Sequence, residues 1–269
     1  MKLGLAFCLL WVLFLFPARA VFAADDLRPA VEVRLGGLIT DFSSDLRIND
    51  SDGLRGSGID LESDLDIEDA LEAFRMDLRW RFRQKHSIDF AYYDISRSGR
   101  RVIDRTLEIG DQTFPIGTNL SSTMNFEVFK LAYAYSFSQS EKSEASVSLG
   151  VHAIDVGFRA KGRLLGIPVD RQTSEVVLPL PVLGFQYSRH LGGHFSLNAD
   201  VDLFAIEYGD YKGSLWDAHL TLDMAFTDQV GGFLGYNLVD MGVESEDEDL
   251  LGKLNYQYGA LTLGVRLTF

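Results

Sequence analysis

The chain has 269 residues and only one cysteine, Cys8, near its start. An intrachain disulfide is excluded, because it needs two cysteines. Cys8 also lies in an apolar run from Leu3 to Phe16 that reads as part of a removable leader. The mature protein should therefore have no thiol chemistry.

Long apolar segments and an excess of basic residues are also missing. Beyond residue 24, no stretch approaches the roughly 18 consecutive apolar residues that a membrane-spanning helix needs. Lysine and arginine number 25 against 39 aspartates and glutamates, for a net charge of −14. A chain this acidic is a poor partner for nucleic acid, whose phosphates attract basic surfaces.

The N-terminus has the pattern of a secretory signal peptide. Lys2 provides a basic start, the apolar run follows, and small residues lead up to Ala20 and Ala23. The apolar run is too short to cross a bilayer. We therefore expect residues 1–23 to be a signal peptide cleaved after Ala20 or Ala23, and residues 24–269 to form one domain.

Beyond the leader, the sequence alternates between apolar and polar residues with a period of two. This pattern places one face of a β-strand in an apolar environment and the other in a polar one. Each segment is about 10–14 residues long, which suits a tilted strand that crosses a membrane. The ten segments are residues 30–42, 72–82, 87–96, 126–137, 145–158, 176–188, 195–207, 214–226, 230–243 and 256–269.

The last nine residues show the clearest alternation. Leu261, Leu263, Val265, Leu267 and Phe269 are apolar, whereas the residues between them are small or polar. The chain ends on this aromatic residue, although soluble domains commonly end in a polar tail. The segment resembles the closing strand of bacterial outer-membrane β-barrels. The resemblance implies that the barrel-assembly machinery reads this end.

These features predict an all-β fold, a transmembrane antiparallel up-and-down β-barrel. An open sheet would leave backbone groups unpaired in lipid, so only a closed barrel can span the membrane with strands. Ten strands fit the segments, with eight or twelve as alternatives. The resemblance to small outer-membrane barrels implies residence in the outer membrane of a Gram-negative bacterium, among its lipids and lipopolysaccharide.

Connections should alternate between long and short. Long ones are predicted at 43–71, 97–125, 159–175 and 244–255, and a tight turn is predicted at 209–212. Both termini are expected in the periplasm, together with the short turns. Aromatic residues of outward parity, most of them near those turns, are typical of an interfacial girdle. They are Trp80, Phe82, Tyr135, Phe137, Phe185, Tyr187, Trp216, Phe226 and Phe269.

Residues of inward parity carry charges of both signs. Because an unpaired buried charge is costly, we expect them to pair and to plug a narrow lumen. A narrow path for ions or small solutes is the alternative. The inward set is Glu32, Arg34, Arg75, Asp77, Arg79, Arg81, Asp89, Lys130, His152, Asp200, Asp202, Asp217, His219, Asp223 and Arg266.

One predicted hairpin allows its register to be predicted and contains residue pairs whose spacing can be compared with that of a catalytic site. If residues 210–211 form its turn, Asp202 opposes His219 and stabilises its protonated form. The spacing of Asp217 and His219, with that of Asp200 and Asp202, resembles the Asp-x-His and Asp-x-Asp pairs of omptins, which are outer-membrane proteases. An omptin sets its pairs across the barrel mouth, whereas here both lie on one hairpin. We therefore expect a structural role and keep Asp202, Asp217 and His219 as weak catalytic candidates.

Two predicted loops are strongly acidic. Neither has the spacing of an EF-hand, so we expect a solvated acidic rim. The alternative is Ca²⁺ or Mg²⁺ that bridges these carboxylates to lipopolysaccharide phosphates, because both ions prefer oxygen ligands. Leu61, Leu65 and Ile67 alternate with the first acidic run, which also suggests a strand extension or a short amphipathic element. The candidate ligands are Asp60, Glu62, Asp64, Asp66, Glu246 and Asp247.

No enzyme signature stands out. The Gly-x-Ser-x-Gly motif of a nucleophile elbow is absent from the sequence. The leading hypothesis is a non-enzymatic barrel without a cofactor, which contributes to envelope structure or surface interaction. A narrow channel and an omptin-like hydrolase are the alternatives.

Overall fold

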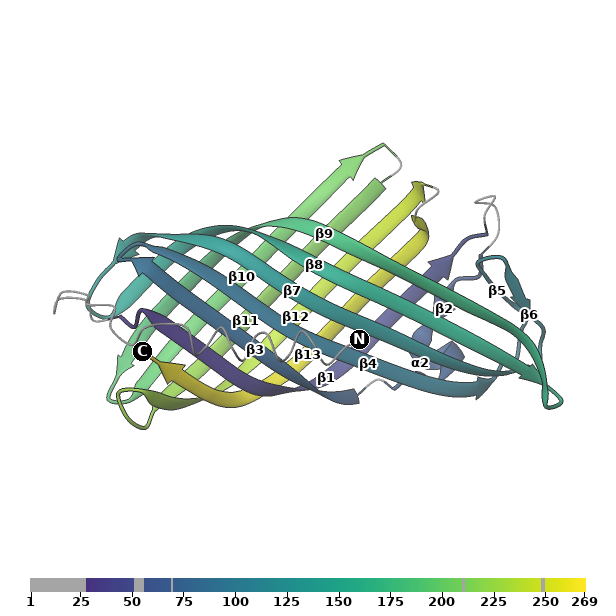
Figure 1. Cartoon of the computed structure of the whole chain (residues 1–269), viewed down its shortest axis with the longest axis horizontal. Coiled ribbons are helices and arrows are strands. Elements are labelled where there is room, and N and C mark those ends of the chain that lie inside the picture. The colour runs from purple at the N-terminus through teal and green to yellow at the C-terminus, as the bar shows by residue number, and fades with distance from the viewer. Residues whose placement is uncertain (1–27, 51–55, 69, 210, 248–249) are drawn as a thin grey trace.

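Ten long antiparallel strands close into one barrel, because the first of them pairs with the last (Figure 1). The computed structural model describes residues 28–50, 56–68, 70–209, 211–247 and 250–269. The predicted ten-stranded barrel is confirmed, and the signal peptide lies outside the described residues. The barrel strands are β1 (Val31–Ile48), β3 (Ala70–Arg83), β4 (His86–Val102), β7 (Asn119–Gln139), β8 (Ser143–Leu164), β9 (Ile167–Gly192), β10 (Phe195–Tyr208), β11 (Tyr211–Ala225), β12 (Val230–Asp247) and β13 (Leu250–Thr268).

The two ends of the barrel differ. The turn end holds the connections 84–85, 140–142, 193–194 and 226–229, together with the start of β1 and the end of β13. The loop end holds the remaining connections. Among the described helices, none is long and apolar enough to cross a membrane.

Two connections predicted to be long are only two residues long. β8 and β9 run for 22 and 26 residues and meet at Leu165-Gly166, where both residues have positive φ. A two-residue turn of this kind matches the twist of a β-hairpin. Likewise, β12 and β13 are separated by residues 248–249 alone. The predictions of long connections at 159–175 and 244–255 are therefore wrong.

These strands were predicted too short because the polarity of their faces inverts along their length. On β8, the outward Leu149 and Val151 are exposed, whereas further along the strand the outward residues are charged, as at Asp155 and Lys161. The inward face changes in the opposite sense, from the polar His152 to Ile154 and its apolar successors. A search for outward apolar residues alone therefore stops at the inversion.

The outward apolar residues form a belt around the half of the barrel nearer the turn end. Large exposed side chains in it include Leu131, Leu149, Leu183, Leu220 and Leu263. Such a belt is what a barrel presents to lipid. The residues predicted for the girdle lie on its turn side, except Trp216, which lies toward the loop end beside Asp240 in the ladder. The turn-side residues are Trp80, Phe82, Tyr135, Phe137, Phe185, Tyr187, Phe226 and Phe269.

Two small elements fill the loop end. β2 (Ile59–Asp60) pairs with β1 and leads into the helix α2 (Leu61–Leu65), whose Leu61 and Leu65 are completely buried. Within the long connection predicted at 97–125, a hairpin of β5 (Leu107–Ile109) and β6 (Gln112–Phe114) turns at residues 110–111. The first acidic loop is thus a short amphipathic element, and its apolar side faces the barrel interior.

Candidate functional site

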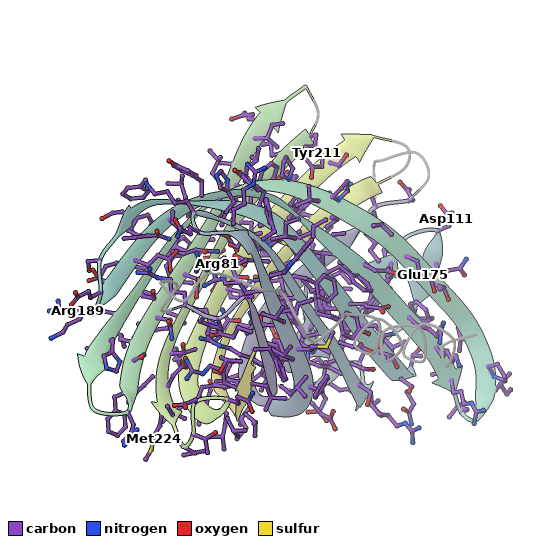
Figure 2. All side chains as sticks on the ribbon, turned by 60° about the vertical axis from the view of Figure 1, so that its left-hand side comes forward. Arg81, Asp111, Glu175, Arg189, Tyr211 and Met224 are labelled. Atoms are coloured by element: carbon purple, nitrogen blue, oxygen red, sulfur yellow. The ribbon has the colours of Figure 1, made fainter. Side chains whose placement is uncertain are left out.

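The lumen holds layers of paired charges, of which the first lies nearest the turn end. Arg81 donates to both carboxylate oxygens of Glu144 at 2.8 and 2.9 Å, and its side chain lies inside the barrel (Figure 2). Arg28 Nε lies 2.9 Å from the same carboxylate, and Ser136 also donates to it. Bidentate arginine–carboxylate pairs are among the strongest polar contacts in proteins. Glu144 was not predicted from the sequence, because it lies between the predicted strands 126–137 and 145–158, where no inward or outward parity was assigned.

The second layer joins β1, β11 and β13. Arg34 lies 2.9 Å from Asp223 and 3.0 Å from Glu32. Arg266 lies 3.3 Å from Asp223, and Asn198 donates to that carboxylate at 3.0 Å. Two cations thus face two anions, which leaves the layer close to neutral.

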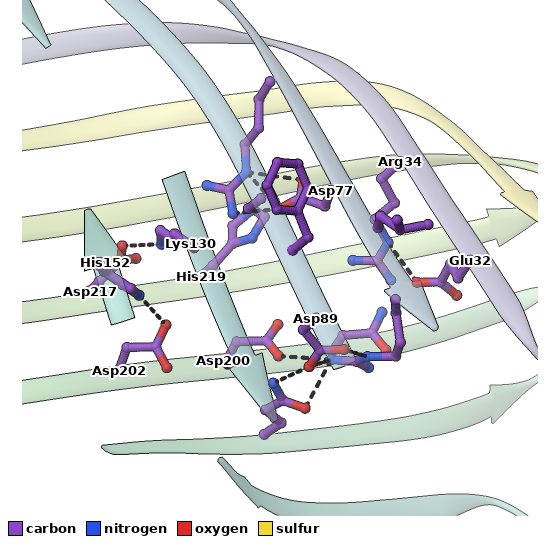
Figure 3. Close-up of a pocket in the computed structure, with 18 residues that line it drawn as sticks. Glu32, Arg34, Asp77, Asp89, Lys130, His152, Asp200, Asp202, Asp217 and His219 are labelled. Carbon is purple, nitrogen blue, oxygen red and sulfur yellow. Dashed lines mark hydrogen bonds and ion pairs between the residues drawn. The ribbon is translucent and has the colours of Figure 1, made fainter. Parts of the chain in front are cut away.

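The third layer joins β3 and β4 to the opposite side of the lumen. Arg79 donates to both oxygens of Asp89, at 2.8 and 3.1 Å. Asp89, labelled in Figure 3, also accepts from Gln186 of β9 at 2.8 Å, and Gln186 accepts from Arg79 at 2.9 Å. Asp200 is a more distant partner, 3.8 Å from Arg79.

The fourth layer is the most enclosed. Lys130 forms an ion pair with Asp217, and Asn237 donates to the other oxygen of Asp217 at 2.9 Å. Arg75 pairs with Asp77 at 2.8 Å and donates to Asn237 at 3.1 Å. Asn237 thereby links two ion pairs into one network.

The two histidines of the fourth layer have separate partners. His152 Nε2 lies 3.1 Å from Asp202, and His219 Nε2 lies 3.2 Å from Thr262 Oγ1. The predicted contact between Asp202 and His219 is therefore wrong. The two residues are not opposite each other, because the observed register of their hairpin differs from the predicted one.

The shift in register follows from the turn. Tyr208 pairs with Tyr211, so the turn is at residues 209–210 and not at 210–211. Gly209 has a φ of +56°, which glycine adopts at little cost. The ladder moves by two residues, so the inward faces are kept while the pairs become Asp200–His219 and Asp202–Asp217.

The charged layers surround a small polar cavity. Its volume is about 110 Å³, and its lining includes Glu32, Arg79, Asp89, Asp200 and Asp202. A cavity of this size and polarity accommodates several water molecules. It is too small for a peptide or a lipid headgroup.

An apolar layer closes the lumen on the loop side of the charges. Tyr256 stacks on Phe126 with ring centres 3.8 Å apart and lies near Phe42 and Tyr258. A cavity of only about 10 Å³ is left among these rings. The lumen is thus filled by polar pairs in one half and by apolar side chains in the other.

The helix α2 is fixed over this apolar layer by a buried arginine. The Arg97 side chain has no exposed surface and lies 2.7 Å from Glu62 of α2. It also donates to Ser44 at 2.8 Å and sits over the Phe42 ring, 4.1 Å from its centre. Arg97 was not predicted as an inward residue, because Arg97 lies beyond the predicted end of its strand.

The acidic residues proposed as cation ligands are largely engaged with protein groups. Asp60 caps α2 by accepting from the Ser63 backbone at 2.7 Å, and Asp64 pairs with Arg105 at 2.6 Å. Asp66 ends the helix in the left-handed conformation. Among the described residues, no group of three or more metal-ligating side chains is suited to hold an ion. Glu246 and Asp247 belong to β12, but their side chains lie outside the description.

Neither a family model nor a curated protein sequence matches the chain. Solved barrel structures do match. The outer membrane protease OmpT from Escherichia coli has a TM-score of 0.56 at 9% identity, covering 93% of this chain and 99% of that one. The transport unit of the autotransporter AIDA-I from Escherichia coli has a TM-score of 0.45 at 7% identity, covering 93% and 94%. Neisserial surface protein A has a TM-score of 0.34 at 13% identity, covering 89% and 97%.

These similarities concern the fold alone, because the identities are low. Together with the closed ten-stranded sheet and its apolar belt, the match to OmpT shows that the chain has the fold of an outer-membrane β-barrel. The similarities specify no activity.

Proposed function

We propose that this protein is a closed, non-enzymatic barrel that contributes to envelope structure or presents a surface for interaction. The proposal rests on the way in which side chains fill the lumen. Paired charges fill the half that the belt surrounds, and an apolar layer fills the half toward the loop end. An ion that crosses the barrel would have to break buried pairs and then lose its hydration in the apolar layer, and both steps are costly.

Conductance across a planar lipid bilayer tests this proposal. The refolded wild-type barrel should conduct barely above the bare membrane. Replacing Phe42 and Tyr256 by alanine removes two of the rings that close the lumen, so conductance should rise. Ile39→Ala is the matched control, because Ile39 faces outward on the same strand. A steady open-channel current in the wild type would favour the narrow channel instead.

Burial of the candidate catalytic residues supports the non-enzymatic reading. Asp217 and His219 are only 4% and 8% exposed, and Asp217 is occupied by Lys130 and Asn237. Asp202 is engaged with His152. The closed loop end and the charged layers on the other side keep a polar peptide away from this layer.

We further propose that the turn end, with both termini, faces the periplasm. Short turns on that side and long connections on the other are typical of outer-membrane barrels. Cysteines at the exposed Leu165 and Glu141 test the orientation in intact cells. A membrane-impermeant maleimide should label Leu165→Cys of the loop end and should leave Glu141→Cys of the turn end unlabelled.

Lipopolysaccharide is the proposed partner of the wall beyond the belt. Arg100 of β4 and Arg159, Lys161 and Arg163 of β8 lie on the outward face there. Ser121 lies between Arg100 and Lys161 in the ladder, so the cations share one surface. Among the ion pairs of the described chain, none involves these four residues. Free cations beside hydroxyls suit lipopolysaccharide phosphates. The assembly machinery that reads the C-terminal strand is the other proposed partner.

A further inference from the structure

The barrel wall has a break between β9 and β10. These strands pair from the turn end only as far as Leu183 and Leu203. Beyond that point β9 pairs with β8 alone, as far as Ile167, and β10 pairs with β11 alone, as far as Tyr208. The two hairpins diverge visibly toward the loop end (Figure 1).

Two prolines explain why the pairing stops at that point. Pro179 and Pro181 lie within the ladder between β8 and β9, which passes through both without a shift in register. Proline has no N–H to donate, so in a continuous ladder its missing donor must point to the other neighbour, which here is β10. In a continued register, Pro181 would oppose Ala205 and Pro179 would oppose Glu207. Both pairs would lack a donor.

The break begins inside the apolar belt. The outward Leu183 and Leu203 beside it are 67% and 50% exposed, and Val177, further along β9, is 60% exposed. Charged outward residues begin further along the break, with Glu207 of β10 level with Pro179, Asp155 of β8 level with Val177, and Glu175 of β9 beyond them. A backbone N–H without a hydrogen-bond partner is strongly unfavourable in hydrocarbon, where no water can replace the partner. An edge that carries two prolines exposes fewer such donors, so it is suited to face lipid.

The inner side of the break is also apolar. Leu178, Leu180 and Val182 face the interior from β9 and are at most 4% exposed. Phe204 of β10 packs against the same apolar cluster. Leu180 lies opposite His152 of the fourth charged layer, and the inward residues beyond it on β9 are apolar, so the break leads to the border between that layer and the apolar half of the interior.

We propose that this break is a lateral portal, through which one hydrocarbon chain of a membrane lipid passes between β9 and β10 and reaches Leu180 and Val182. A protein strand fits the site less well, because a strand added to β9 would meet two prolines that cannot donate. The side from which the lipid comes rests on the proposed orientation of the barrel, but the portal itself does not.

Paramagnetic broadening of methyl signals tests the portal. The full barrel is placed in phosphatidylcholine nanodiscs that contain a lipid with a nitroxide near the end of one acyl chain. The methyl signals of Leu180 and Val182 should broaden several-fold more than that of Leu38. Leu38 is the matched control, because it is equally buried and faces inward from the opposite wall, on β1. Broadening of Leu180 no greater than that of Leu38 would overturn the proposal.

A variant that closes the wall adds a second measurement. Replacing Pro179 and Pro181 by threonine supplies two backbone N–H donors, so β10 should pair with β9 along this stretch. Broadening at Leu180 should then fall to the level of Leu38, and the amides of Ala205 and Glu207 should gain protection from hydrogen exchange. Pro168→Thr is the control, because Pro168 lies near the start of β9, remote from this break. If the amides of Ala205 and Glu207 become protected in the double variant but the Leu180 signal stays as broad as in the wild type, the lipid chain does not enter between β9 and β10, and the proposal is overturned.

The two proposals fail separately. A conducting wild-type barrel would contradict the closed lumen, whereas the broadening reports only the position of a lipid chain. A wild-type particle that is a dimer in nanodiscs, with Ala205 and Glu207 already protected from exchange, would show that a second copy covers the break and would overturn the portal.

Discussion

At the scale of single residues, the stability of the barrel depends on ion pairs in the lumen, because removal of one member leaves the other charge buried and unpaired. Lys130 and Asp217 are 11% and 4% exposed, so removing the ammonium leaves a buried carboxylate without its ion-pair partner, held by the hydrogen bond from Asn237. Lys130→Met should therefore lower the free energy of unfolding by about 3–5 kcal/mol, measured by urea titration in detergent. Adding Asp217→Asn removes the uncompensated charge and should restore most of the loss. Equal unfolding midpoints for wild type and single variant would contradict the pairing.

His219 should be far less sensitive than Lys130. Its described polar contact is one hydrogen bond with Thr262, so His219→Asn should cost about 1 kcal/mol. Peptide hydrolysis is measured on the same purified samples, with none expected from either protein. A hydrolytic activity of the wild type that disappears in folded His219→Asn would restore the omptin-like alternative.

The inward positions of the charged residues could be predicted from sequence, but their partners could not. Parity alone places Arg81 or Asp202 inside, because strand side chains alternate strictly. The partner depends on the register between strands. The turn that contains Gly209 shifts the register of one hairpin by two residues from the predicted one, and the same faces still point inward. Contacts across the lumen, such as that of Arg79 with Gln186, also depend on barrel closure, which no local pattern encodes.

At the scale of elements, the closure of the barrel rests on its terminal strands. Val31 and Phe269 exchange two backbone hydrogen bonds, of 3.0 and 2.9 Å, at the turn end. Deleting Phe269 removes this pair as well as the aromatic end that resembles an assembly signal. The truncated chain should be exported but poorly inserted, as measured by heat-modifiable mobility of the outer-membrane fraction. Wild-type amounts of heat-modifiable protein in that fraction would contradict this expectation.

The ten strands were predictable because the belt imposes a simple pattern on each of them. The ends of the strands were not, since beyond the belt the same strand is apolar inside and polar outside. Arg97 shows the consequence. It lies one residue past the predicted segment 87–96, on the inward face of β4, where it holds α2 in place.

At the scale of the whole molecule, the inversion of polarity divides the barrel into a lipid-facing half and a polar-walled half. The chain carries a net charge of −14, yet Arg159, Lys161 and Arg163 follow one another on the outward face of β8. A local cluster of cations can bind polyanions despite an opposite net charge, because screening confines each charge to about 10 Å. This surface is therefore the part of the wall best suited to phosphate groups.

Reversing two of these charges should weaken binding to lipopolysaccharide. We expect Arg159→Glu with Lys161→Glu to reduce capture of the refolded barrel on immobilised lipopolysaccharide by an order of magnitude or more, because attraction becomes repulsion. The urea midpoint should stay unchanged, since neither side chain makes an ion pair within the described structure. Arg83→Glu with Lys85→Glu is the matched control, because both side chains are exposed at the turn end and neither forms an ion pair within the described structure. Equal loss in both variants would show a response to overall charge, and this would contradict a site on β8.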